Sequence, residues 1–145
     1  MFTMPSHILL VDDEADFVEM LGLRLQETGQ LVATASSGQQ CLEVLKEKDI
    51  DVIILDVKMP GMDGIETLQA VKQAYPLVEV IMLTGHGTMD AAIQGMKLGA
   101  FDFLFKPADF DDLTDKLNKA VARKREQTDR IRKAEAEMLL RRAKI

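Results

Sequence analysis

The chain has 145 residues, of which 47% are hydrophobic and 29% charged, a composition typical of one globular domain with an ordinary core. Its one cysteine, Cys41, excludes an internal disulfide, and no apolar run approaches the roughly 18 residues that a membrane-spanning helix needs. The apolar stretch near the amino terminus is too short for a signal peptide, so we expect a cytoplasmic protein with no membrane partner.

Short apolar runs alternate along the chain with longer segments of helical periodicity. The runs, each typical of a strand, are 7–11, 31–35, 52–55, 80–83 and 101–105. Three of them are almost continuously apolar, as is typical of parallel strands covered on both faces. The helical segments are 15–28, 37–47, 64–74, 88–98 and one that starts at 109. Ser37, Thr88 and Asp109 are predicted as N-caps.

Five strand–helix repeats imply right-handed crossovers and an α/β fold with a doubly wound parallel sheet. The inward face of segment 15–28 is predicted to hold Phe17, Met20, Leu21 and Leu25.

Charge divides the chain into an acidic body and a basic tail. Residues 1–115 carry 7 Lys and Arg against 20 Asp and Glu, a net charge of −13, whereas residues 116–145 carry 11 against 4, a net charge of +7. We therefore expect a domain over 1–122 and a basic helical extension or linker over 123–145. An acidic body has the wrong sign for a phosphate backbone, and nothing after 122 is typical of a helix-turn-helix, so we predict no direct nucleic-acid binding.

Polar residues stand where the predicted strands end, which is where doubly wound sheets bind their ligands. They are Asp12 and Asp13 after the first strand, Asp56 at the end of the third, Thr84 at the end of the fourth and Lys106 at the end of the fifth. Three carboxylates on one rim repel one another by roughly 4 kcal/mol for each pair near 4 Å. With no Cys or His at these positions, a hard cation such as Mg²⁺ fits best.

A lysine ammonium and a threonine hydroxyl suit the neutralisation and hydrogen bonding of a phosphoryl group, so the rim indicates phosphoryl transfer to a carboxylate. Each residue also has a simpler interpretation. Asp12 and Asp13 can cap the following helix, 60–64 can be only a turn, Lys106 can be a solvated side chain and Thr84 a strand end.

Four motifs in this sequence resemble the receiver domain of two-component response regulators. They are LLVDDE at 9–14, ILDVKMPGMDG at 54–64, MLTGHG at 82–87 and GAFDFLFKP at 99–107, and the resemblance covers about residues 6–122. It implies a flavodoxin-like (CheY-like) five-stranded sheet of order 2-1-3-4-5, here with an extended C-terminal helix. The stretch from 84 to 107 is especially similar to receivers attached to ATPase-type transcriptional activators.

The resemblance implies a role for each residue of the rim. Asp56 would be the phosphoacceptor. Asp13 and Asp56 would bind Mg²⁺ through their side chains and Lys58 through its backbone carbonyl, while Asp12 would support the metal through its water shell.

Four further roles follow from the same resemblance. Lys106 would pair with one phosphoryl oxygen and Thr84 would hydrogen-bond another. Phe103 occupies the position of the family's switch aromatic, where packing among neighbouring phenylalanines is the alternative. Lys58 and His86 would tune dephosphorylation by controlling water access, with an ordinary surface loop as the alternative.

The function implied is a phosphorylation-activated signalling switch. A sensor histidine kinase or a phosphotransfer protein would phosphorylate Asp56, and slow self-dephosphorylation would reverse it, so the chain would not be an enzyme acting on other substrates. The alternative is the N-terminal regulatory fragment of a larger transcriptional regulator. A haloacid-dehalogenase-type phosphatase is disfavoured, because its D-x-D-x-[TV] pattern is absent around Asp56.

The last helical segment runs from Asp109 to the end without Pro or Gly. Its first half has an inward stripe of Phe110, Leu113, Leu117, Ala120 and Val121. The run 122–130 is almost wholly polar, and apolar residues then return at about heptad spacing. They are Ile131, Ala134, Met138 and Ile145.

A polar helix that projects alone has little reason to stay ordered. We therefore expect it to pair with a second copy of the chain, together with the face formed by 88–122. A frayed linker is the alternative, because Lys124, Gln127 and Arg141 interrupt the apolar seam.

Overall fold

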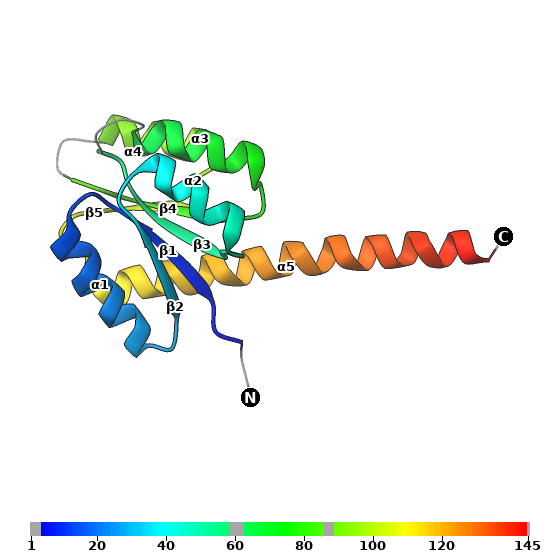
Figure 1. Ribbon diagram of the computed structural model, residues 1–145. Helices are drawn as coiled ribbons and strands as arrows, with labels where there is room; N and C mark the ends of the chain where they lie inside the picture. Colours follow the sequence, from blue (N-terminus) through cyan, green and yellow to red (C-terminus); the bar gives the residue numbers. More distant parts are fainter. Residues whose placement is uncertain (1–3, 59–62, 86–88, 145) are drawn as a thin grey trace.

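The computed structural model describes residues 4–58, 63–85 and 89–144. Within them, strands and helices alternate along the chain (Figure 1). The strands are β1 (His7–Val11), β2 (Leu31–Ala35), β3 (Val52–Asp56), β4 (Glu79–Thr84) and β5 (Asp102–Phe105). The helices are α1 (Ala15–Glu27), α2 (Gly38–Glu47), α3 (Gly64–Ala74), α4 (Met89–Lys97) and α5 (Phe110–Ala143). The predicted elements are confirmed, with ends that differ by no more than one residue.

The strands form one parallel sheet of order β2-β1-β3-β4-β5, the flavodoxin-like order that the resemblance implied. The register pairs Val11 with Leu55, Asp56 with Leu83, and Thr84 with Phe105. The carboxyl ends of β1, β3, β4 and β5 therefore meet at one edge of the sheet.

Helices cover both faces of the sheet, as Figure 1 shows. Val52 and Ile54 of β3 pack in a cluster with α1 and α5, whereas Ile53 and Leu55 pack in a cluster with α2 and α3. Because successive side chains of a strand point to opposite faces, a strand buried on both must be apolar at every position. This is why β3, which is buried at every position, reads as an almost continuous apolar run.

The inward face of α1 differs from the prediction at one residue. Leu21 and Leu25 are buried and Phe17 is partly buried, but Met20 is 57% exposed, so its placement on the inward face was wrong. Gly22 is buried instead. A Cβ added at Gly22 would make ordinary contacts with Leu10 and Val32, so the inward face includes Gly22 rather than Met20.

Side chains cap the helices at two of the predicted positions. Ser37 accepts a hydrogen bond from the Gln40 amide, and Asp109 accepts one from the Asp111 amide. Thr88 lies outside the described residues. Asp63, which was not predicted, caps α3.

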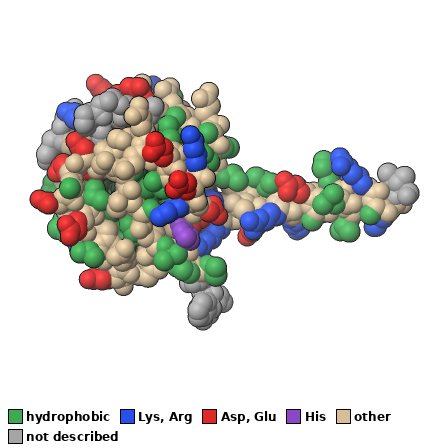
Figure 2. Space-filling model, in the orientation of Figure 1, with side chains coloured by type: hydrophobic (Ala, Val, Ile, Leu, Met, Phe, Trp, Pro, Cys, Tyr) green, Lys and Arg blue, Asp and Glu red, His purple; other side chains and the backbone are tan. Residues whose placement is uncertain are grey.

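Helix α5 continues without a break across the expected domain boundary at 122/123 and projects beyond the sheet (Figure 1). The predicted stripe is buried from Leu113 to Val121, and Phe110 is partly buried. After Thr128 every described residue is exposed, and Figure 2 shows basic and hydrophobic side chains along this projecting half. No helix in the described part of the chain combines the length and apolar character needed to cross a bilayer.

Candidate phosphoryl-transfer site

Asp56 is the last residue of β3, a strand that is buried throughout, and it is only 6% exposed. Its backbone is held by the start of α3. The Gly64 amide donates a hydrogen bond of 2.9 Å to the Val57 carbonyl, and a Cβ added at Gly64 would lie 2.5 Å from the Asp56 carbonyl oxygen. Only glycine permits this approach.

Two further carboxylates meet Asp56 at this edge of the sheet. One oxygen from each of Asp12, Asp13 and Asp56 lies within 4.8 Å of the others. Asp12 is buried and Asp13 is exposed. Asp12 also accepts a hydrogen bond of 2.9 Å from the Glu14 amide, but the N-cap position of α1 belongs to Glu14.

Lys106 brings a positive charge to the same place. Its Nζ lies 2.7 Å from Asp12 Oδ2, 3.6 Å from Glu14 Oε1 and 3.9 Å from Asp56 Oδ1. The ammonium also lies 4.5 Å from the centre of the Phe17 ring, a cation–π distance. Burial alone would lower the pKa of the Lys106 ammonium, but the hydrogen bond to Asp12 and the charges of the three carboxylates outweigh it and raise that pKa. Lys106 is therefore a fixed cation at neutral pH.

The Asp56 carboxyl is poised between its charged and neutral forms. Its pKa is raised from an ordinary value of 3.8 to about 6, first by burial and then by the charges of Asp12 and Asp13. The Lys106 ammonium and the Lys58 amide act in the opposite direction. The remaining upward shift shows that the protein alone does not fully compensate the Asp56 charge, so an added cation would be favoured there.

Thr84 offers a hydroxyl without a partner. It is fully buried at the end of β4, and its Oγ1 makes no hydrogen bond within residues 4–58, 63–85 and 89–144. The Lys106 amide donates to the Thr84 carbonyl at 2.6 Å, which ties the ends of β4 and β5 together. A buried hydroxyl of this kind is disfavoured unless a group that enters the site binds it.

The other residues predicted for the site differ in what surrounds them. Phe103 is partly buried against the α2–α3 side of the core, with its ring 5.4 Å from that of Phe105 and edge-on to it. Lys58 is exposed, and its amide lies 3.3 Å from Asp56 Oδ1. His86 lies outside the described residues.

Sequence reasoning missed Phe17 and Glu14 as neighbours of Lys106, and Gly64 as the support of Asp56. Phe17 and Glu14 could have been predicted from the sequence. They lie just after a strand end and in the first turn of the next helix, and such residues border the same rim. Gly64 has none beyond its place in a glycine-containing turn.

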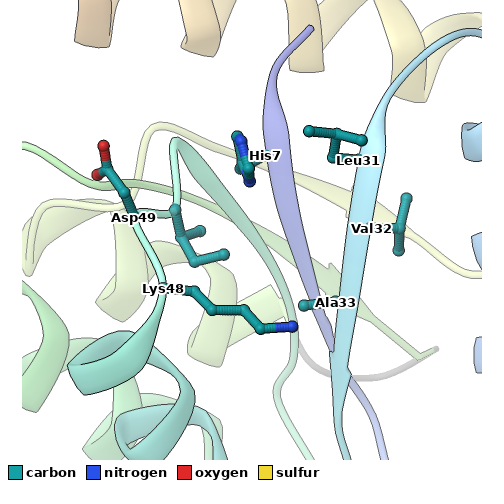
Figure 3. A pocket seen from close by; sticks show the side chains of 7 residues that line it. His7, Leu31, Val32, Ala33, Lys48 and Asp49 are labelled. Carbon is teal, nitrogen blue, oxygen red and sulfur yellow. The ribbon is translucent and has the colours of Figure 1, made fainter.

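A separate hollow lies at the opposite end of the sheet and does not belong to this site. His7, at the start of β1, Lys48 and Asp49 contribute to its lining (Figure 3). Figure 3 shows the Lys48 side chain extending toward Ala33 of β2. The rim around Asp56 lies at the other ends of these strands.

The donor set at the rim fits a hard cation. Carboxylate oxygens are ligands that Mg²⁺ prefers, and among the residues described at this rim there is neither sulfur nor imidazole. The cluster combines these oxygens with a fixed ammonium and an unpartnered hydroxyl, which are the groups that a phosphoryl group needs.

Comparison with known proteins shows the family of the chain. The family model for the response regulator receiver domain matches residues 8–118. The transcriptional regulatory protein ZraR of Escherichia coli O157:H7 is 41% identical over 79% of this chain and 26% of its own length. The DNA-binding transcriptional regulator NtrC of Klebsiella pneumoniae is 37% identical over 81% of this chain and 25% of its own length. The chain thus spans about a quarter of these relatives.

Solved structures share the fold. A response regulator receiver domain protein from Clostridium thermocellum matches with a TM-score of 0.81 and 40% identity, over 84% of this chain and 98% of that one. NtrX from Brucella abortus, in complex with ADP, matches with a TM-score of 0.82 and 28% identity, over 87% of this chain and 29% of that one.

Proposed function

Because the chain belongs to the response regulator receiver domain family, we propose that it is a phosphorylation-controlled signalling switch whose phosphoacceptor is Asp56. The setting of that carboxylate carries the proposal. It is nearly buried, lies in a cluster with Asp12 and Asp13, and is 3.9 Å from the Lys106 ammonium. A buried carboxylate beside an ammonium and a hydroxyl suits nucleophilic attack on a phosphoryl group.

In the proposed reaction, a carboxylate oxygen of Asp56 attacks the phosphorus of a phosphohistidine. An O–P bond forms while the P–N bond breaks, and the electron pair stays with the imidazole, which takes up a proton. The Lys106 ammonium pairs with one phosphoryl oxygen in exchange for part of its contact with the carboxylates. The buried Thr84 hydroxyl donates a hydrogen bond to another.

Bound Mg²⁺ would supply positive charge beside the transferred oxygens. Asp13 and Asp56 would hold it through their carboxylates, Lys58 through its backbone carbonyl and Asp12 through water. Water attack on the phosphorus would later regenerate Asp56, and Lys58, which is exposed beside the carboxylate, would control access of that water. The only reactions that we propose for the chain are its own phosphorylation and slow dephosphorylation.

The phosphodonor would be a sensor histidine kinase or a phosphotransfer protein in the cytoplasm. We further propose that the chain is the regulatory part of a longer transcriptional regulator. This proposal is favoured by the lengths of the relatives, because the chain spans only about a quarter of the transcriptional regulators that it matches.

We also propose that two copies of the chain pair. Helix α4 exposes Met89, Ile93 and Met96 along one side, and the projecting half of α5 exposes Ile131 and Met138. These surfaces are apolar and have no partner within the described residues of one chain.

Phosphorylation by acetyl phosphate with Mg²⁺ tests the proposed acceptor, with intact mass as the readout. The parent chain should gain one phosphoryl group and Asp56→Asn none, because an amide cannot form the acyl phosphate. Asp51→Asn is the matched control, since it makes the same change at the other end of β3, and it should be labelled like the parent. Labelling of Asp56→Asn at the parental level would exclude Asp56 as the acceptor.

A further inference from the structure

The polar run after residue 122 is not simply solvated. Lys124 is mostly buried, with 14% of its side chain exposed, and its Nζ lies 3.1 Å from Asp51 Oδ1 and 3.8 Å from Asp49 Oδ1. Asp51 directly precedes β3 and is itself only 9% exposed. Its other oxygen accepts a hydrogen bond of 2.9 Å from the His7 amide at the start of β1. Lys124 thus neutralises a buried carboxylate that links two strands.

Arg123 contacts the start of β4. Its Nε lies 3.6 Å from Glu79 Oε2, and its guanidinium lies 5.8 Å from the centre of the Phe101 ring. Glu79 is the first residue of β4 and is only 3% exposed, and its other oxygen lies 3.5 Å from Lys72 Nζ of α3. A buried carboxylate of this kind needs its cations.

Arg125 contacts the chain segment that leads into β1. Its Nη2 donates hydrogen bonds to the Met4 carbonyl at 2.9 Å and to the Pro5 carbonyl at 3.4 Å. Three consecutive basic residues therefore contact the amino ends of three different strands, at the place where α5 leaves the sheet in Figure 1.

We propose that Arg123, Lys124 and Arg125 form an electrostatic joint that fixes the direction of the projecting half of α5 relative to the sheet. The apolar stripe of α5 ends at Val121, so beyond it these contacts hold the helix to the body. The Lys124–Asp51 pair is buried, whereas the Arg123 side chain is 56% exposed and Glu79 is also paired with Lys72. A swing of the helix at its root would therefore leave the Asp51 carboxylate without its cation.

The joint also places the helix root at the far ends of the strands that carry the acceptor site. Asp51 and Glu79 stand at the amino ends of β3 and β4, and Asp56 and Thr84 stand at their carboxyl ends. Any domain or second copy that follows or binds the projecting helix would therefore be held at a defined orientation to the site.

Spin-label distance measurement on the full chain tests the joint. Labels at Gln73→Cys on α3 and Ala136→Cys on α5 report the direction of the helix, because both positions are exposed. Cys41 is buried and burial raises the pKa of its thiol to about 12, so it remains unlabelled. Labelled chains are diluted with unlabelled chain, so that only distances within one molecule are detected.

The joint variant is Arg123→Gln with Lys124→Gln and Arg125→Gln. Its matched control removes three charges farther along the same helix, as Arg130→Gln with Arg132→Gln and Lys133→Gln, where the side chains are exposed. Glutamine is a good helix former, so helix propensity changes little in either variant.

The control should keep the narrow distance distribution of the parent, whereas the joint variant should broaden it at least about twofold and speed amide exchange over 126–130 about tenfold. Equal widths in parent and joint variant, or equal broadening in both variants, would overturn the proposal. If the joint variant also loses protection in β3, Lys124→Gln is compared with Lys133→Gln instead. Only Lys124→Gln should then broaden the distribution, and an unchanged width would reject the joint.

Discussion

At the scale of single residues, the two aspartates at the ends of β3 have opposite surroundings. Asp51 is bound by the Lys124 ammonium and the His7 amide, so its negative charge is compensated. Asp56 lies among other carboxylates, and its raised pKa records a charge that the protein compensates incompletely. An aspartate charge therefore stabilises the folded state at the amino end of β3, whereas at the carboxyl end it destabilises it.

Removing the Asp56 charge should stabilise the protein without metal. Since its pKa is about 6 in the folded protein and ordinarily 3.8, the folded state binds more protons than the unfolded state between these values. The free energy of unfolding thus falls as pH rises through this window, by on the order of 3 kcal/mol. Asp56→Asn should therefore raise the free energy of unfolding, measured by urea denaturation, near pH 8. Near pH 4, where the Asp56 carboxyl is already neutral in the folded protein, the substitution should change that free energy little.

Asp51→Asn serves as the control, because it leaves Lys124 with a weaker partner. It should destabilise the protein near pH 8 by about 1–3 kcal/mol. A loss of stability in Asp56→Asn near pH 8, similar to that in Asp51→Asn, would mean that the Asp56 charge is well compensated.

Asp13→Ala should weaken magnesium binding while leaving the fold intact. Removing one of several crowded carboxylates takes away a ligand and relieves repulsion, so the thermal stability without Mg²⁺ should be unchanged or raised. Titration calorimetry measures the binding, with Asp16→Ala as the control that removes a nearby exposed charge. Parental affinity in Asp13→Ala would show that Asp13 is not a ligand.

At the scale of elements, two helical glycines serve different purposes. A Cβ added at Gly22 of α1 would make ordinary contacts of 3.7 Å with Leu10 and 3.8 Å with Val32. A Cβ added at Gly64 of α3 would lie 2.5 Å from backbone atoms of Asp56 and Val57. The first position has room for a methyl group, whereas the second requires the strand end to move.

Alanine substitutions should therefore act in opposite directions. Gly22→Ala should stabilise the protein by about 0.5–1 kcal/mol through helix propensity. Gly64→Ala should destabilise it by about 1–3 kcal/mol and slow phosphorylation, because it displaces the backbone that carries Asp56. Urea denaturation and acetyl phosphate labelling measure the two effects. Parental stability and rate in Gly64→Ala would show that α3 does not fix Asp56.

At the scale of the whole molecule, the side of α5 that packs onto the sheet is followed, in the projecting half of the helix, by exposed apolar residues on the same side. Leu117 is buried, Lys124 faces the body, and Ile131 and Met138 follow at the same spacing of seven residues but are 44% and 56% exposed. Leu139 and Leu140 are exposed beside this seam, and Ile145 lies outside the described residues. Lys124, which was expected to interrupt the apolar seam, instead pairs with Asp51 of the folded domain.

Pairing of two copies should depend on this seam. Light scattering should give a mass near twice 16.2 kDa for the full chain bound to a phosphoryl mimic, and the mass of one chain for Ile131→Glu with Met138→Glu. Leu139→Glu, which adds a charge beside the seam, is the control and should still pair. A full chain that stays monomeric at high micromolar concentration, with and without the mimic, would exclude the dimer.

Local sequence patterns were enough to predict the helices and strands and the polar residues at the strand ends. Apolar runs such as 52–55 mark strands buried on both faces, and Asp12, Asp56 and Lys106 each directly follow or end such a run. These features depend on residues close together in the chain, so a local pattern records them.

Which charges are compensated, and how closely the elements approach one another, could be learned only from the packed fold. Lys124 and Asp51 are 73 residues apart, and nothing in a polar run distinguishes a solvated lysine from one that neutralises a buried carboxylate. The same holds for Phe17 beneath Lys106, for the buried hydroxyl of Thr84 and for Gly64 against Asp56. Each of these contacts joins segments that are distant in the chain and that the fold brings together. The free energy of a buried charge or a close contact depends on the atoms around it in space, not on its neighbours in the chain.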